Sequence, residues 1–128
     1  MSMQVTAIML GVQDLARAKA FYTDGLGAKI AQDYPGFVSL NLGDGSSSLA
    51  LYPWDAAAGD AGVSPEGQGF RGVSFHYIVA TPQEVDEAIA AAVAAGGGVV
   101  KEAVATQWGY YGYFSDPDGY LWKVATGA

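Results

Sequence analysis

Few side chains of this chain are able to do chemistry. His76 is the single histidine, and there is no cysteine, which excludes disulfides, thiolate metal sites and a cysteine nucleophile. A lone histidine on a strand is either a hydrogen-bonded wall residue or a general acid–base group. Lys123 stands in an apolar, strand-like run, so it is paired, near the mouth of a cavity, or reaching solvent along its stem. The sequence favours a wall residue, so the catalytic residue stays unknown and His76 is its one candidate.

The run Asp116-Pro117-Asp118-Gly119 places two carboxylates close together, as a cation site would. The same four residues also have the composition of a tight turn before a strand, and the sequence favours that interpretation.

Composition limits the classes of function. The chain has 128 residues, the size of one domain, with 51% hydrophobic and 15% charged residues. A net charge of −7 with six Lys and Arg argues against a nucleic-acid partner, because phosphate contacts need clustered cations. An acidic surface favours cationic small molecules or simply keeps the protein soluble. No apolar run approaches the ~20 residues of a membrane span, and no signal peptide is recognisable, so we expect no membrane partner and a cytoplasmic location.

The strands and helices that must position the candidate functional residues occur in the same order twice along the chain. A strand, a helix and further strands fill residues 1–55, and the same order returns in residues 72–128, joined by a Gly- and Ala-rich linker over 56–71. Asp14 is the expected cap of the first helix, and Thr81-Pro82-Gln83-Glu84 is a capping box that begins the second. Since one unit cannot bury its own sheet face, the two units must pack as one domain.

Three segments carry a resemblance to a known family. They are GVQDLARAKAFYTDGLGAKI near the start, SLALYPWD in the middle and YFSDPDGYLWKV near the end. Together they resemble the vicinal-oxygen-chelate superfamily, which holds glyoxalase I, extradiol dioxygenases and bleomycin-resistance proteins. The resemblance implies an α+β fold of two tandem βαβββ modules, whose curled mixed sheet surrounds a pocket with the helices outside. It also implies a homodimer, and the length of the 56–71 linker would allow the modules to exchange between two chains.

Metal-dependent members of that family place four ligands, usually His or Gln and Glu, on four inward strand positions. Matched onto this chain, the four positions are Ala7, Ala50, Ser74 and Lys123. Alanine offers no donor atom, a serine hydroxyl alone is a poor ligand, and a lysine ammonium group has no lone pair. We therefore expect no metal and no other cofactor.

Strand alternation extends the inward set to a group of aromatic and polar side chains. Ten residues are predicted to bind a ligand: Phe37, Asn41, Tyr52, Trp54, Ser74, His76, Trp108, Tyr111, Tyr113 and Lys123. Trp54 and Trp108 are expected at the rim. Aromatic walls with a few polar groups suit flat or cationic molecules, although such residues also fill sheets and dimer interfaces.

Three functions follow. The first is metal-free binding of a small aromatic or cationic molecule, as in sequestration of a drug or metabolite. The second is a glyoxalase-like lyase or dioxygenase with displaced metal ligands. The third is metal-free acid–base catalysis by His76, with Lys123 holding an anion. The first is the leading hypothesis, and whether the chain is an enzyme stays open.

Overall fold

The structure is a computed structural model that describes residues 3–67 and 69–126. The chain divides into two compact units at Gly67. We call the described part of the first unit the first module (3–67) and that of the second unit the second module (69–126). Each is described by itself.

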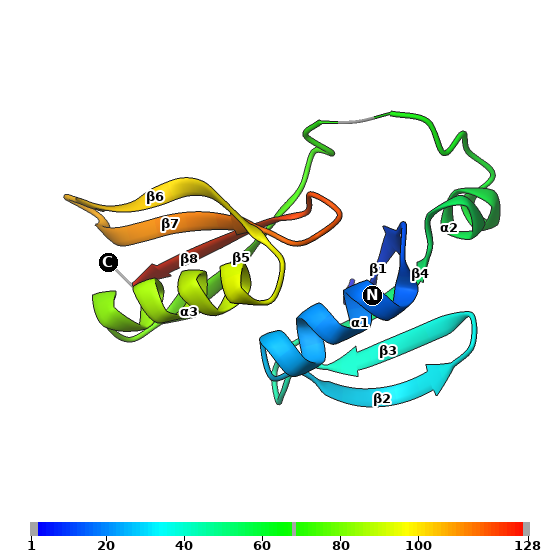
Figure 1. Ribbon diagram of the computed structural model, residues 1–128, viewed down its shortest axis with the longest axis horizontal. Coiled ribbons are helices and arrows are strands. Elements are labelled where there is room, and N and C mark those ends of the chain that lie inside the picture. Colours follow the sequence, from blue (N-terminus) through cyan, green and yellow to red (C-terminus); the bar gives the residue numbers. More distant parts are fainter. Residues whose placement is uncertain (1–2, 68, 127–128) are drawn as a thin grey trace. The chain divides into compact units, whose positions relative to one another are not determined.

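The first module holds one four-stranded sheet, two α-helices and a π-helical turn (Figure 1). Its elements in chain order are β1 (Ala7–Val12), α1 (Leu15–Ala20), η1 (Phe21–Gly25), β2 (Lys29–Tyr34), β3 (Phe37–Asn41), β4 (Ser48–Pro53) and α2 (Trp54–Ala61). The strand order is β1-β4-β3-β2, with β1 parallel to β4 and the other neighbours antiparallel.

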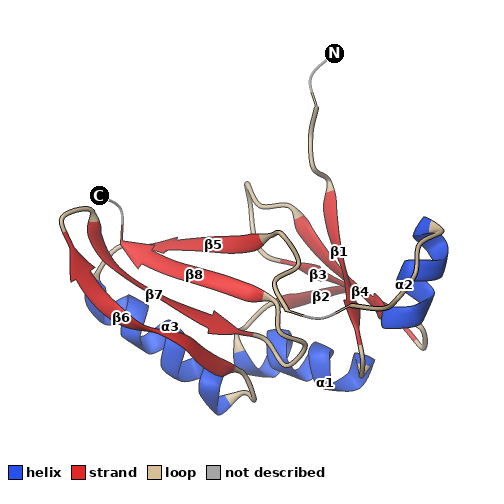
Figure 2. Cartoon of the chain, turned by 90° about the horizontal axis from the view of Figure 1, so that it is seen from above, coloured by secondary structure: helices blue, strands red, loops and turns tan. Residues whose placement is uncertain are grey.

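The second module repeats this topology (Figure 2). Its elements are β5 (Ser74–Val79), α3 (Pro82–Ala94), β6 (Gly98–Thr106), β7 (Gly109–Ser115) and β8 (Leu121–Thr126). The order is β5-β8-β7-β6, again with one parallel pair, β5 and β8, and two antiparallel pairs. The predicted α+β class with two tandem βαβββ modules is confirmed.

Both predicted helix starts are present. The Asp14 carboxylate accepts a hydrogen bond of 3.0 Å from the Arg17 backbone N–H, which satisfies one unpaired amide of the first turn. At α3 the Thr81 hydroxyl accepts a 3.2 Å bond from the Glu84 N–H and donates one of 3.2 Å to the Glu84 carboxylate. Pro82 fills the first turn, where a missing N–H costs nothing.

The core of the first module lies between α1 and one face of its sheet. Alternate residues of three strands turn to that face because successive strand side chains point in opposite directions. The fully buried members are Leu10, Val12, Val38, Leu40, Leu49 and Leu51. Phe21 and Tyr22 close this core from η1 with their rings edge to face at 5.0 Å, both 1% exposed.

In the second module α3 covers one face of the sheet and contacts all four strands, β7 most extensively (Figure 1). Val85, Ile89 and Ala92 of α3 are buried, together with Phe114 and Val124 of the sheet. The Trp122 ring stacks on that of Phe114 at 6.0 Å and tilts against that of Phe75 at 4.9 Å. Helical spacing also predicts burial of Val93, and this is wrong: Val93 is 43% exposed because it lies one residue past the buried stripe of α3.

The segment expected as a linker is partly helical. Residues 56–61 form most of α2, whose composition is rich in alanine. The helix lies against the end of β1, where a Cβ on Gly11 would stand 3.4 Å from the Trp54 Cα and 3.5 Å from the Ala57 Cβ. Within the described residues, no helix is long and apolar enough to cross a membrane.

Candidate ligand-binding site

The face of the second sheet that points away from α3 carries half of the residues of the predicted site. We call it the open face of the second sheet. The cross-strand register places His76 of β5 opposite Lys123 of β8, and Lys123 opposite Tyr113 of β7. Tyr113 in turn lies opposite Lys101 of β6. A single row of four functional side chains therefore runs across all four strands.

Tyr111 contacts two ammonium groups next to this row. The Lys101 Nζ donates a 2.5 Å hydrogen bond to the Tyr111 hydroxyl and lies 4.7 Å from the ring centroid. The Lys123 Nζ lies 4.8 Å from the same centroid. The Tyr113 ring meets the Tyr111 ring edge to face at 6.3 Å. Two rings and two cations thus form one contiguous patch.

The two lysines change the acidity of Tyr111. The hydrogen bond from Lys101 lowers the pKa of Tyr111 below its ordinary value of 10.0. Desolvation opposes this effect, and the charges of Lys101 and Lys123 lower the pKa further. The pKa of the neighbouring Tyr110 is raised instead, because its hydroxyl donates a 2.7 Å bond to the Asp86 carboxylate on the α3 side. The open face therefore favours negative charge on a phenol oxygen.

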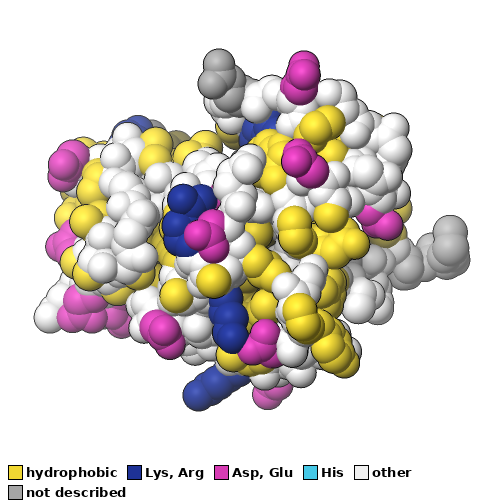
Figure 3. Space-filling view, turned by 45° about the vertical axis from the view of Figure 1, so that its right-hand side comes forward, with side chains coloured by type: hydrophobic (Ala, Val, Ile, Leu, Met, Phe, Trp, Pro, Cys, Tyr) yellow, Lys and Arg dark blue, Asp and Glu magenta, His cyan; other side chains and the backbone are white. Residues whose placement is uncertain are grey.

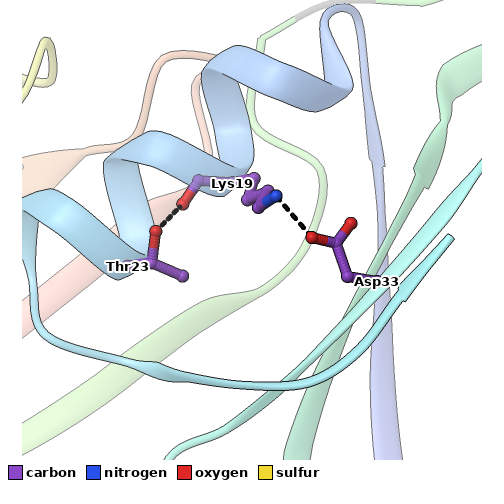
Figure 4. Close-up of polar contacts among 3 residues, drawn as sticks. All are labelled: Lys19, Thr23 and Asp33. Atoms are coloured by element: carbon purple, nitrogen blue, oxygen red, sulfur yellow. Dashed lines mark hydrogen bonds and ion pairs between the residues drawn. The ribbon is translucent and has the colours of Figure 1, made fainter. Parts of the chain in front are cut away.

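Neither lysine of the patch forms an ion pair with a carboxylate in the described part of the chain. Lys19 of α1 is a useful comparison (Figure 4), since its Nζ lies 2.5 Å from the Asp33 carboxylate of β2. The turn after Lys19 is further tied by a 2.7 Å bond from the Thr23 hydroxyl to the Lys19 carbonyl oxygen. Lys101 and Lys123 instead direct their charge to an aromatic ring and its hydroxyl.

Ser74 and His76 complete the patch on β5. The Ser74 hydroxyl and Nε2 of His76 are joined by a long hydrogen bond of 3.4 Å. Both belong to the same face because they are two positions apart on one strand, with Phe75 between them. The structure thus brings together five of the ten predicted ligand residues, listed here: Ser74, His76, Tyr111, Tyr113 and Lys123.

The predicted residues of the first module form a smaller group. Phe37 of β3 and Tyr52 of β4 meet edge to face at 6.1 Å, on the side of the sheet away from α1. Asn41 is used in a turn, where its side-chain oxygen accepts a 2.8 Å bond from the Gly43 N–H. Trp54 begins α2, and its indole N–H donates a 2.6 Å bond to the Pro65 carbonyl oxygen. Only Phe37 and Tyr52 are brought together by this sheet.

Trp108 lies at the turn between β6 and β7, and its side chain is 70% exposed.

A separate hollow of the second module lies between residues 69–73 and the turn before β8, lined by Phe70, Arg71 and Tyr120 among others. None of the predicted ligand residues lines it. The open face and this hollow are therefore different places. Hydrophobic side chains reach the surface in several places on the view in Figure 3, between acidic and basic ones.

The four family ligand positions stand in equivalent places in the two sheets. Ala7 pairs with Ser48, two residues before Ala50, and Ser74 pairs with Leu121, two residues before Lys123. Within the described residues of the two modules, no group of three or more His, Cys, Asp or Glu side chains is placed to hold a metal ion. The side chains at the four positions supply at most one hydroxyl oxygen, so this donor set does not fit a metal ion.

Lys101 is the functional residue that sequence reasoning missed. The run VVKEAVAT before the Gly109 turn has the β-branched composition of a strand, which was a usable signal. The face on which Lys101 lies could not be predicted from alternation, because the pairing of β6 with β7 shifts on both sides of it. The shifts fall between Val99 and Lys101 and between Lys101 and Val104.

Comparison with solved structures agrees with this fold. Curated proteins give no match to the chain. A glyoxalase-related enzyme from Fulvimarina pelagi has a solved structure with a TM-score of 0.87 and 29% identity, covering 97% of this chain and 88% of that one. A glyoxalase/bleomycin resistance protein/dioxygenase family enzyme from Burkholderia phytofirmans gives 0.85 and 20% identity, covering 98% and 100%.

A lactoylglutathione lyase from Agrobacterium tumefaciens gives a TM-score of 0.68 at 21% identity, covering 97% of this chain and 93% of that one. These last two likenesses show the fold alone. The family model described as Glyoxalase/Bleomycin resistance protein/Dioxygenase superfamily matches residues 4–124, almost the whole chain. The chain therefore belongs to the glyoxalase/bleomycin resistance protein/dioxygenase superfamily.

Proposed function

We propose that this protein binds a small aromatic organic molecule without a metal ion, as a protein that sequesters a drug or metabolite does. The observation that carries the proposal is the patch on the open face of the second sheet, where the Tyr111 and Tyr113 rings meet at 6.3 Å beside two ammonium groups. Aromatic contacts of this kind contribute about 0.5–1.5 kcal/mol each beyond area burial. Amino and hydroxyl groups around them would fix the orientation of the ligand.

The family contains both enzymes and resistance proteins, so membership by itself does not indicate the function. The side chains at the four family ligand positions distinguish the two classes. Enzymes that depend on a metal need side chains that chelate it, and Ala7, Ala50, Ser74 and Lys123 do not fit that need. The resistance proteins give the better analogy, since tight binding alone requires only a complementary surface. Of the two ligand types expected from sequence, aromatic and cationic, the lysines of the patch favour an aromatic molecule that is not a cation.

Binding is tested on protein in which the tyrosine ring carbons bonded to oxygen carry carbon-13. The neutral probe is naphthamide, whose addition is followed by nuclear magnetic resonance. We expect saturable shifts of the Tyr111 and Tyr113 signals, whereas Tyr110, which bonds to Asp86 on the other face, stays unchanged. Tyr111→Leu should weaken binding and Tyr110→Phe should not. A panel of neutral and anionic aromatic probes that leaves both site signals unmoved would refute the proposal.

Metal independence is tested separately by native mass spectrometry of untreated protein mixed with nickel, manganese, zinc or iron(II). We expect no stoichiometric metal, and naphthamide binding that is unchanged by a chelator. One tightly held metal per chain would favour the lyase or dioxygenase function instead. The same spectra give the oligomeric state, which the family resemblance leads us to expect to be a homodimer.

A further inference from the structure

We infer that Lys101, Lys123 and Tyr111 form an anion-binding subsite, so that the ligand of this protein is an aromatic molecule carrying a carboxylate or a similar small anionic group. The inference rests on the proposed function, because it names the chemical class of ligand for the same open face. It adds a charge requirement that aromatic binding by itself does not contain.

Three neighbouring strands each supply one residue of the subsite. Lys101 comes from β6, Tyr111 from β7 and Lys123 from β8. Both Nζ atoms lie within 5 Å of the Tyr111 ring centroid, at 4.7 and 4.8 Å, so both charges act on the same ring. Lysines that merely kept the surface soluble would be expected to point apart, because like charges repel. A negative group that lies against the Tyr111 ring would therefore be attracted by both ammonium groups.

Charge distribution makes the placement unusual for this chain. The protein has four lysines and a net charge of −7, and two of the four lysines meet at Tyr111. Acidic side chains are abundant, yet neither of these lysines has a carboxylate partner among the described residues, whereas Lys19 bonds to Asp33. An anionic ligand would supply the negative charge that no carboxylate of the described residues supplies to Lys101 and Lys123.

Hydrogen-bonding capacity points the same way. Each ammonium group has three N–H donors and no acceptor, and the Tyr111 hydroxyl adds one donor. A carboxylate accepts up to about four hydrogen bonds, which matches such a set of donors. The lowered pKa of Tyr111 agrees, because its first cause is the hydrogen bond from Lys101, followed by opposing desolvation and the two lysine charges. The patch already favours negative charge on an oxygen atom.

The experiment compares naphthoate with naphthamide, two probes of nearly equal shape that differ in charge. Binding is measured at low ionic strength on the full chain, through the Tyr111 and Tyr113 signals described above. We expect naphthoate to bind roughly tenfold or more tightly than naphthamide, since hydrogen bonds to charged groups are worth about twice those between neutral ones. The preference should decline as salt is added, because Lys101 is exposed to solvent and Tyr111 and Lys123 are partly exposed.

Lys101→Met and Lys123→Met test the two cations, and Lys29→Met removes the same charge from β2 of the first module as a control. We expect each patch variant to reduce naphthoate affinity about three- to tenfold, and naphthamide affinity by less than about twofold. Lys29→Met should change neither. Equal affinity of the wild-type protein for both probes, or equal losses in all three variants, would overturn the subsite.

Failure of the subsite and failure of the proposed function give different results. If both probes bind equally well, aromatic binding stands and the anion subsite is rejected. If neither probe binds, the proposed function is rejected. The anion subsite is then tested by itself, with inorganic phosphate as the probe. Phosphate that shifts the Tyr111 signal in the wild-type protein but not in Lys101→Met would support the subsite, whereas no shift would reject it as well.

Discussion

Lys101 donates a hydrogen bond of 2.5 Å from its ammonium group to the hydroxyl of Tyr111, between the paired strands β6 and β7. The adjacent residue of β7, Tyr110, turns to the other face and donates its own hydroxyl to Asp86 of α3 at 2.7 Å. Two consecutive tyrosines therefore meet opposite charges, because successive side chains of a strand point to opposite faces. Each relationship has a measurable consequence.

The pKa of Tyr111 should rise when Lys101 is replaced by Met. The hydrogen bond and positive charge of Lys101 stabilise the phenolate, so their removal returns the pKa toward the ordinary value of 10.0. The titration is followed through the carbon-13 signal of Tyr111. Lys29→Met serves as the control and should leave the pKa where it is. An unchanged pKa in Lys101→Met would show that the hydrogen bond does not persist in solution.

Asp86→Asn should have the opposite effect on Tyr110. The hydrogen bond to the Asp86 carboxylate stabilises the neutral phenol, and the nearby negative charges of Asp86 and Glu102 disfavour the phenolate. Removing the charge of Asp86 should therefore lower the pKa of Tyr110. In the wild-type protein Tyr111 should lose its proton at lower pH than Tyr110. The reverse order of titration would contradict both assignments.

Gly112→Ala should destabilise the protein. A Cβ at this position of β7 would stand 2.7 Å from the Ile89 Cδ1 atom, 3.0 Å from the Ala103 Cα and 3.0 Å from the Lys101 carbonyl oxygen. Since two of these atoms belong to the backbone of β6, we expect a loss of about 1–3 kcal/mol of unfolding free energy.

Urea denaturation measures the Gly112 effect, and Gly36→Ala is the matched control, since a Cβ on Gly36 meets nothing within 4 Å. Adding Ile89→Val to Gly112→Ala should recover part of the loss by removing the Cδ1 atom. If Gly112→Ala were as stable as Gly36→Ala, the close contact of α3 with β7 would be wrong.

Thr81→Ala should cost about 1 kcal/mol of stability, the usual effect of removing an N-cap. The Thr81 hydroxyl accepts the 3.2 Å bond from the Glu84 N–H, and alanine leaves that amide without its partner. Thr81→Ser keeps the hydroxyl and should retain most of the stability. Thermal unfolding followed by circular dichroism compares the two variants, and equal losses would show that the cap contributes nothing.

Local patterns in the sequence were sufficient for the modules and for the starts of α1 and α3. Asp14 and Thr81 cap helices as expected, because a cap depends only on residues three positions apart. The face assignments of β5 and β8 also follow from alternation, which brings His76 and Lys123 together. Helix α2 was not predicted, although the alanine-rich run after Trp54 favours a helix.

The sequence by itself determined the tandem plan, the helix starts and which side chains of a regular strand share a face, because each depends on neighbours along the chain. Only the tertiary structure decided that Lys101 belongs beside Tyr111 and Lys123. That meeting depends on strand pairing between β6 and β7, and irregularities on both sides of Lys101 shift its register. Likewise, only the folded chain shows that the Asn41 side chain bonds to Gly43 and that the Trp54 indole bonds to Pro65. Alternation specifies a face, but partners across strands and loops are specified only once the chain has folded.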